Sequence, residues 1–179
     1  MKIRLYLIMF ICMFCLLSSA CSSNKENYKP NNLKTTTVCS KCGMIIANYA
    51  GPHVQIVWKD GKHTFYCDLF EIMPDIMNKA ERERIGAIYV QKGFPKKGTL
   101  NGWIDATKAI YVVDSRKLGS MGISYVPFED INKAKKFKDI YGGEILHYSQ
   151  INQKVLDKTR KLMVDKPEEY SPHFGPGLL

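Results

Sequence analysis

Two cysteines and a methionine lie within six residues of one another, in the segment CSKCGM. Cys39 and Cys42 are separated by two residues, and Met44 follows two positions later. Cysteines at this spacing can turn their sulfurs toward one point, and Gly43 permits the sharp backbone turn that this requires. Thiolate and thioether sulfurs are soft ligands, which favour Cu(I) over hard cations. The segment therefore predicts a Cu(I) site with Cys39, Cys42 and Met44 as ligands.

Three further side chains could supply ligands to the same metal. His63 and Cys67 are four residues apart, and alternate residues of a strand share one face, so both could point to a common site. Met121 stands in the stretch GSMG, where a large apolar residue has little reason to be present for packing. The simpler interpretations are a solvated turn residue for His63 and a small buried hydrophobe for Cys67. The candidate ligands are thus Cys39, Cys42, Met44, His63, Cys67 and Met121.

Two other uses of the cysteines remain open. Three cysteines and one histidine at these spacings resemble a closed structural zinc site, which would make the protein an exported interaction module and leave Met44 unexplained. A cysteine pair separated by two residues can also perform thiol-disulfide exchange, or oxidise to a small-loop disulfide. The pair does not stand between a strand and a long helix, as it does in thioredoxin-like enzymes. Zinc binding and oxidoreductase activity are the alternatives to copper binding.

The N-terminal twenty residues have the pattern of an export signal. Two basic residues precede an uncharged apolar run that is too short to cross a bilayer comfortably as a helix. Small residues then lead to Cys21, as in bacterial lipoproteins whose cysteine is acylated, although Ser18 replaces the leucine usual there. Cleavage before Cys21 without acylation is the alternative. We expect a signal peptide at 1–20, lipidation of Cys21 and a flexible tether at 21–37, so that the protein is exported and anchored to a membrane, facing the periplasm.

The formal net charge is +9 and is spread over several groups of lysines. An exported protein normally has no access to nucleic acid, so nucleic-acid binding is not expected. Attraction to anionic lipid or to an acidic partner fits the charge, and so does a simple solvated surface. The sequence contains no Ser/His/Asp order and no phosphate-binding glycine loop. We therefore expect a carrier and not an enzyme.

Strand-like and helix-like segments alternate in an order that occurs twice. Two β-rich runs flank Asp60-Gly61, a strong hairpin turn signal, and a helical apolar pattern that contains Pro74 follows. The predicted elements are strands at 54–58, 63–66 and 87–90 with a helix at 68–79, then strands at 110–113, 124–128 and 144–148 with a loop at 116–122 and a helix at 129–139, and a last helix at 151–164. We predict an α+β fold with a domain at 38–151, composed of two tandem ββαβ units at about 38–92 and 101–150, followed by a C-terminal helix and irregular tail at 152–179.

Several of these segments resemble the NosL family, the copper-binding accessory lipoproteins of nitrous oxide reductase maturation. The resemblance rests on CSKCGMIIA, TFYCDLFEIM, GAIYV, GWIDATKAIYVVDS, GSMG, YVPFEDINKA and YGGEILHY, in this order after a lipoprotein-like leader. It implies two similar ββαβ units, and a Cu(I) site at Cys42 and Met44 with Cys39 as the accompanying thiol. Met121 matches a methionine of the family that precedes the helix of the second unit. The resemblance also implies delivery of copper, received from a donor protein, to nitrous oxide reductase or another cuproprotein client. Ser18 and the additional pair of His63 and Cys67 depart from the family pattern.

Overall fold

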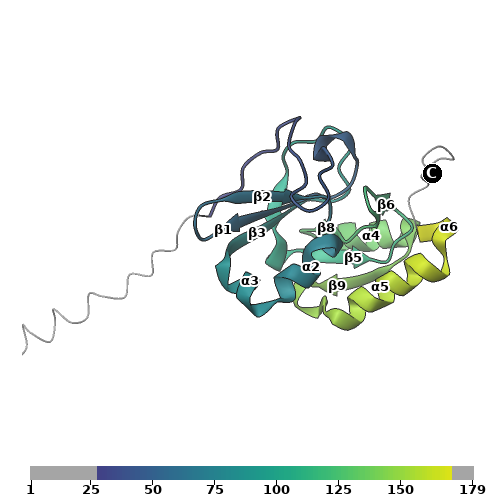
Figure 1. Ribbon diagram of the computed structural model, residues 1–179. Coiled ribbons are helices and arrows are strands. Elements are labelled where there is room, and N and C mark those ends of the chain that lie inside the picture. Colours follow the sequence, from purple (N-terminus) through teal and green to yellow (C-terminus); the bar gives the residue numbers. More distant parts are fainter. Residues whose placement is uncertain (1–27, 171–179) are drawn as a thin grey trace, which may run out of the picture.

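The computed structural model describes residues 28–170 (Figure 1). The expected signal peptide, the lipidation site Cys21 and the first part of the tether lie outside the described residues, as does the end of the tail from residue 171. Among residues 28–170, no helix combines the length and the apolar character needed to cross a membrane.

The first unit is an antiparallel sheet with two short helices. Its sheet has the order β2-β1-β3-β4. Asp60-Gly61 forms the predicted hairpin turn, in which Gly61 adopts a positive φ of 83° and Val57 pairs with His63. The elements are β1 (Val54–Trp58), β2 (His63–Tyr66), α2 (Leu69–Met77), α3 (Lys79–Arg84), β3 (Ile85–Gln91) and β4 (Trp103–Asp105).

The second unit repeats the ββαβ order of the first. It comprises β5 (Ile110–Val113), β8 (Val126–Phe128), α4 (Ile131–Tyr141) and β9 (Glu144–His147). Its sheet has the order β8-β5-β9, so the first strand of each unit lies between the second and the last, as in β2-β1-β3. The predicted α+β class and the repeated ββαβ order are confirmed.

Four local features differ from the sequence-based expectations. The helix expected over 68–79 runs through Pro74 and ends at Met77, and a separate α3 begins after Asn78, whose side chain caps it. The loop expected over 116–122 contains a small hairpin, β6 (Leu118–Gly119) and β7 (Gly122–Ile123). Strand β4 was not predicted. The segment expected to be irregular after residue 165 contains α6 (Pro167–Tyr170).

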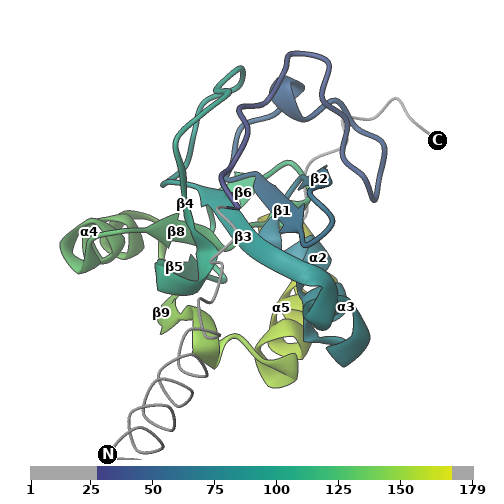
Figure 2. The same ribbon diagram turned by 90° about the vertical axis from the view of Figure 1, so that its left-hand side faces the viewer.

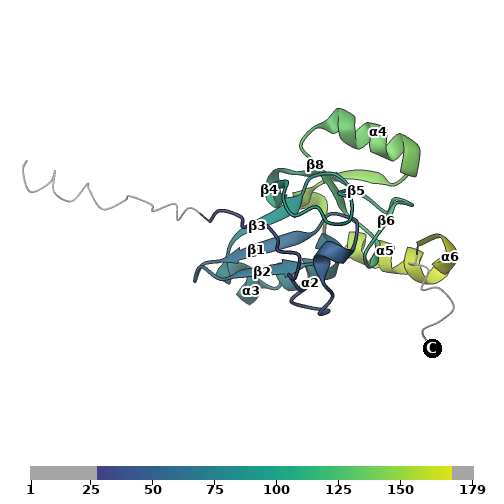
Figure 3. The ribbon, with the colours of Figure 1, turned by 90° about the horizontal axis from the view of Figure 1, so that it is seen from above.

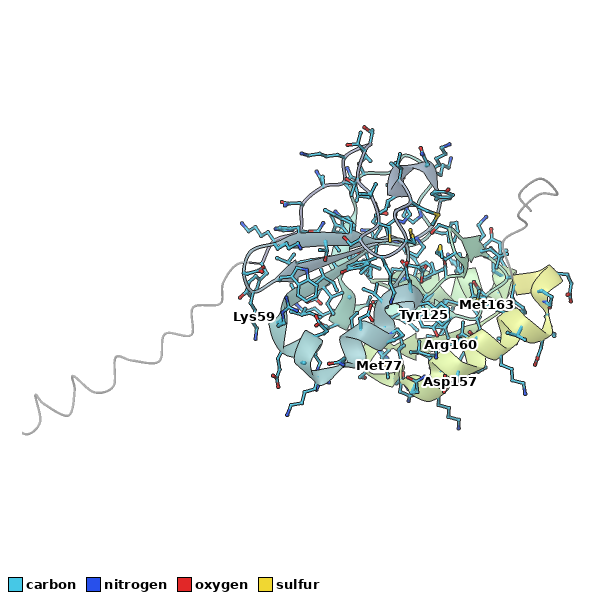
Figure 4. The ribbon with its side chains drawn as sticks, viewed as in Figure 1. Lys59, Met77, Tyr125, Asp157, Arg160 and Met163 are labelled. Atoms are coloured by element: carbon cyan, nitrogen blue, oxygen red, sulfur yellow. The ribbon has the colours of Figure 1, made fainter. Side chains whose placement is uncertain are left out.

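One hydrophobic core joins the two units. Tyr111 and Val113 of β5 face this core together with side chains of β1, β3 and α2, whereas Val112, on the other face of β5, packs beneath α4. The amphipathic α5 (Gln153–Asp165) covers the core through buried Leu156. Figure 4 shows Tyr125 between α2 and α5, where its hydroxyl lies 2.8 Å from the hydroxyl of Thr159.

Two long loops form a lobe on one side of the first sheet. They comprise residues 33–53, which include the short helix η2 (Ile46–Asn48), and residues 92–102 (Figure 2). Three backbone hydrogen bonds join the loops, from Leu33 N to Leu100 O, from Gly51 N to Pro95 O and from Gly98 N to Ala47 O. We call these residues the loop lobe. It contains CSKCGM, so the candidate ligands Cys39, Cys42 and Met44 are held by irregular backbone against a regular sheet.

Candidate metal centre

Three cysteine sulfurs converge where the loop lobe meets the start of α2. The Sγ atoms of Cys42 and Cys67 are 3.4 Å apart. These two sulfurs, Cys39 Sγ and a carboxylate oxygen of Glu71 all lie within 4.8 Å of one another. Three sulfurs and one oxygen at these separations could surround a single ion after small side-chain movements, because metal–sulfur bonds are about 2.3 Å long.

The Cys39–Met44 segment is a tight hairpin, as its glycine predicts. Cys39 N donates to Met44 O at 2.8 Å, and Gly43 N donates to Cys39 O at 3.0 Å. Gly43 has a φ of 77°, a conformation that side-chain-bearing residues rarely adopt. The turn directs Cys42 N to within 3.4 Å of Cys39 Sγ. The backbone thereby brings the sulfurs of the CxxC pair to one side of the hairpin.

The third sulfur belongs to Cys67, directly after β2, and β2 also holds the Cys39–Met44 hairpin in place. Ser40 N donates to Phe65 O at 2.8 Å, so the hairpin is bound to the free edge of β2. Cys67 follows β2 directly, and the next residue, Asp68, caps α2 by accepting a hydrogen bond from Phe70 N. The ring of buried His53 contacts the backbone of Cys67, with Nδ1 3.1 Å from Cys67 O. Burial lowers the pKa of His53, which favours the neutral ring.

Glu71 is the member of the group that sequence reasoning missed. Its carboxylate oxygens lie 3.6 and 3.7 Å from Cys39 Sγ, and one of them accepts a hydrogen bond from Cys67 N at 3.2 Å. The available signal was its position three residues after the cap residue Asp68, from which a glutamate carboxylate can reach back to a backbone N–H before the helix. Glu71 therefore contacts two of the three cysteines.

The structure does not bring His63 to this group. Its Nδ1 lies 3.0 Å from Oε1 of Gln55, on the neighbouring strand β1. The four-ligand site of three cysteines and a histidine, considered from the sequence, is therefore not assembled. In this structure Glu71 occupies the position of the fourth donor.

Both candidate thioethers lie at the cluster. Met44 and Met121 pack against an apolar group that contains buried Cys39 and Cys67, alongside Phe65 and Trp103. Met121 belongs to the turn of the β6–β7 hairpin, so the second unit contributes a side chain beside the cysteines of the first. A close approach of two glycines permits this contact, because a Cβ added at Gly51 would lie 3.2 Å from Gly119 Cα.

The three cysteines differ in their exposure to solvent. Cys39 and Cys67 are 3% and 1% exposed. Cys42, at the tip of the hairpin, is exposed. A metal bound to the three sulfurs would therefore be reached through Cys42.

The pKa values of the Cys42 and Cys67 thiols are both raised, which favours the protonated form of these two side chains. Burial raises the pKa of Cys67 well above its usual value, and the Cys42 thiol raises it further. Partial burial also raises the pKa of Cys42, against the lowering effect of the Met44 N–H. Reactive cysteines of oxidoreductases have depressed pKa values, whereas the pKa values of Cys42 and Cys67 are raised. A soft cation would instead displace the protons on binding.

The chain is similar to known proteins over most of its length. The NosL family model matches residues 30–156. The copper-binding lipoprotein NosL of Stutzerimonas stutzeri is 28% identical over 152 residues, covering 83% of this chain and 80% of that protein. The copper-binding lipoprotein NosL of Achromobacter cycloclastes is 25% identical over 163 residues, covering 87% and 84%.

A solved structure has the same fold. The crystal structure of the copper chaperone NosL from Shewanella denitrificans superposes with a TM-score of 0.65 at 23% identity, covering 71% of this chain and 98% of that chain. The match to the family model takes in both ββαβ units, the hairpin at 39–44 and the β6–β7 hairpin. This chain belongs to the NosL family.

Proposed function

We propose that this protein is an exported, lipid-anchored carrier of Cu(I), and not an enzyme. The observation that carries the proposal is the convergence of three thiols at a place where only one of them, Cys42, is exposed. A carrier must bind its cargo with strong ligands and still present it to another protein. The names of the relatives, copper-binding lipoprotein and copper chaperone, support the same cargo.

The cargo would be bound by soft sulfur. Thiolates of Cys39, Cys42 and Cys67 would be its main ligands, with Met44 and Met121 as thioether neighbours. Thiolate and thioether ligands select Cu(I) over the hard cations. The carboxylate of Glu71 is the one hard donor in the group, and we assign it the role of fixing Cys39 and Cys67.

The client would be a periplasmic cuproprotein. The family resemblance favours nitrous oxide reductase, with a separate protein as copper donor. Lipidation of Cys21 and the tether at 21–37 would keep the loop lobe near the membrane and within reach of the client.

Anaerobic titration of the reduced protein with Cu(I) tests this function. We expect one tightly bound Cu(I) per chain and a folded metal-free protein. Cys42→Ser and Met44→Leu should weaken Cu(I) binding, whereas Met163→Leu should not, because Met163 packs in the main core away from the sulfurs. Unchanged affinity in both the Cys42 and the Met44 variants would contradict the proposal.

A structural zinc site is the second candidate, because Glu71 completes a four-donor group without His63. A zinc-stapled protein would unfold when a chelator removes the ion. Thermal melting before and after chelation separates the two functions, since a carrier has to remain folded after it has released its metal.

A further inference from the structure

The loop lobe is basic throughout. Residues 33–53 and 92–102 contain five lysines and no aspartate or glutamate. Two of these lysines pair with acids of neighbouring elements, Lys41 with Asp75 at 2.8 Å and Lys92 with Glu129 at 2.8 Å. Within the part of the chain that the structure describes, no ion pair involves the other three, which are Lys34, Lys96 and Lys97.

The same lobe exposes apolar side chains beside the cysteines. Val38 and Ile45 pair across the base of the Cys39–Met44 hairpin and are 52% and 41% exposed, and Tyr49 follows at 39%. Side chains alternate between the two faces of an extended pair, so Val38 and Ile45 face outward while Cys39 and Met44 face the cluster. Exposed apolar residues with a charged surround are typical of protein contact surfaces.

From these observations, and resting on the proposed function, we infer that the loop lobe is the docking surface for the protein that exchanges Cu(I) with this chain. The partner would carry carboxylates around an apolar centre that holds cysteine sulfurs. The carboxylates would face Lys34, Lys96 and Lys97, and the apolar centre would cover Val38 and Ile45. Complementary charge steers such encounters and raises association rates by about 10- to 1000-fold.

A protein fits this surface better than a lipid headgroup does, because the basic and apolar residues share a lobe with Cys42, the exposed member of the three-cysteine cluster. Transfer would be a ligand exchange without a change of oxidation state. As the partner's thiolates bond to Cu(I), the bonds to Cys42 and then to the buried sulfurs break. Each thiolate that this chain releases takes up one proton from solvent, and each partner thiol that binds Cu(I) gives one proton to solvent.

The test uses the full chain in detergent, reduced and loaded anaerobically with Cu(I). The acceptors are two synthetic peptides with one Cys-x-x-Cys pair, flanked by glutamates in one and by glutamines in the other. We expect the glutamate peptide to gain copper about tenfold faster at low salt, and the difference to disappear at high salt.

Charge reversal locates the surface. The variant Lys34→Glu/Lys96→Glu/Lys97→Glu should remove the preference for the glutamate peptide while leaving Cu(I) affinity unchanged. The matched control is Lys133→Glu/Lys135→Glu/Lys136→Glu, which changes the net charge equally on α4. In the view from above, α4 and β2 lie on opposite sides of the molecule (Figure 3). This control should keep the preference.

A footprint gives a second readout that does not need copper. Amine-reactive labelling, followed by mass spectrometry, measures how far the glutamate peptide protects Lys34, Lys96 and Lys97 in the metal-free chain. Protection of these three and not of the α4 lysines supports the docking surface. Equal effects of the two triple variants, or stronger protection by phosphatidylglycerol vesicles than by the peptide, would overturn it. If the unaltered chain does not bind Cu(I), the proposed function is refuted. The footprint would still test the docking surface in that case, because it is measured on the metal-free chain.

Discussion

The Sγ atoms of Cys42 and Cys67 are 3.4 Å apart, although Cys39 is nearer to Cys42 in sequence. Cys39 Sγ lies 3.6 and 3.7 Å from the two carboxylate oxygens of Glu71. A disulfide requires the two sulfurs to approach to about 2.05 Å, which is a small movement for Cys42 and Cys67. Oxidation of the metal-free protein should therefore join Cys42 to Cys67 and leave Cys39 free.

Glutathione disulfide is a suitable oxidant for this first prediction. Its reduction to two glutathione molecules consumes the two electrons and two protons that the cysteines lose. Peptide mapping without reduction should recover the Cys42–Cys67 pair, and Cys39→Ser should not prevent it. The reaction should be slow at neutral pH, because the pKa values of both thiols are raised and the thiolate is the attacking form. A predominant Cys39–Cys42 disulfide would contradict the structure.

Glu71 should influence which metal the thiols prefer. A carboxylate oxygen suits divalent cations better than Cu(I), which is satisfied by sulfur alone. Glu71→Gln keeps the size of the side chain and an acceptor for Cys67 N, but removes the charge. We expect Zn(II) affinity to fall by about tenfold or more and Cu(I) affinity to change much less, because glutamine can still hold Cys67 in place. Competition titrations with both metals measure the ratio, and an equal loss for the two metals would contradict a preference set by the carboxylate.

The junction between β2 and α2 depends on a buried acid. Asp68 caps α2 through Phe70 N and also accepts from Tyr125 N of the second unit, at 3.3 Å. Burial raises its pKa from 3.8 to about 7, against the lowering effect of these hydrogen bonds. One carboxylate thus links the helix that carries Glu71 to the unit that carries Met121.

The raised pKa predicts how stability depends on pH. The folded protein retains the proton of Asp68 up to about pH 7, whereas the unfolded chain releases it near pH 4, so the free energy of unfolding should decrease as pH rises between these values. The decrease would be on the order of 2–4 kcal/mol. Asp68→Asn keeps the cap acceptor and should flatten this dependence. Urea denaturation of the metal-free protein at several pH values is the measurement, and an unchanged slope in the variant would refute the assignment.

Elements with strong local signals could be predicted from the sequence. Strands β1, β2 and β5 have the predicted limits, because β-branched and aromatic runs are bounded by turn residues such as Asp60-Gly61. Strand β4 and the β6–β7 hairpin could not be predicted, since three- and two-residue strands are stabilised by tertiary contacts and not by local pattern.

The candidate site also contains both residues that the sequence identified and residues that it did not. The cysteines converge as their spacing indicated, through the Gly43 turn and the end of β2. Glu71 could not be distinguished, because a glutamate in the first turn of a helix is ordinary. For His63, a position on the same strand face as Cys67 was not sufficient to predict a metal ligand. Its Nδ1 instead contacts Gln55 of the adjacent strand. Such cross-strand partners follow from register, which the sequence did not establish.

At the scale of the whole molecule, the two ββαβ units differ in the connection between their first two strands. In the first unit, β1 and β2 are joined by the short Asp60-Gly61 turn, whereas in the second unit the connection between β5 and β8 spans residues 114–125 and contains β6 and β7. The longer connection reaches back to the first unit at Gly51 and places Met121 against the apolar group around Cys39 and Cys67. The two-unit arrangement therefore allows one unit to hold the cysteines while the other covers them.

This arrangement predicts that Met121 acts across the two units. Met121→Leu preserves the apolar volume but removes the thioether, so thermal stability should stay within about 1 kcal/mol of the unaltered protein. If the sulfur contributes to the cargo site, Cu(I) affinity should fall on the order of tenfold, and release to a chelator should become correspondingly faster. Met163→Leu, a methionine of the main core, is the control and should change neither quantity. Equal behaviour of the two variants would mean that Met121 only covers the cysteines, and that the second unit takes part in the site through packing alone.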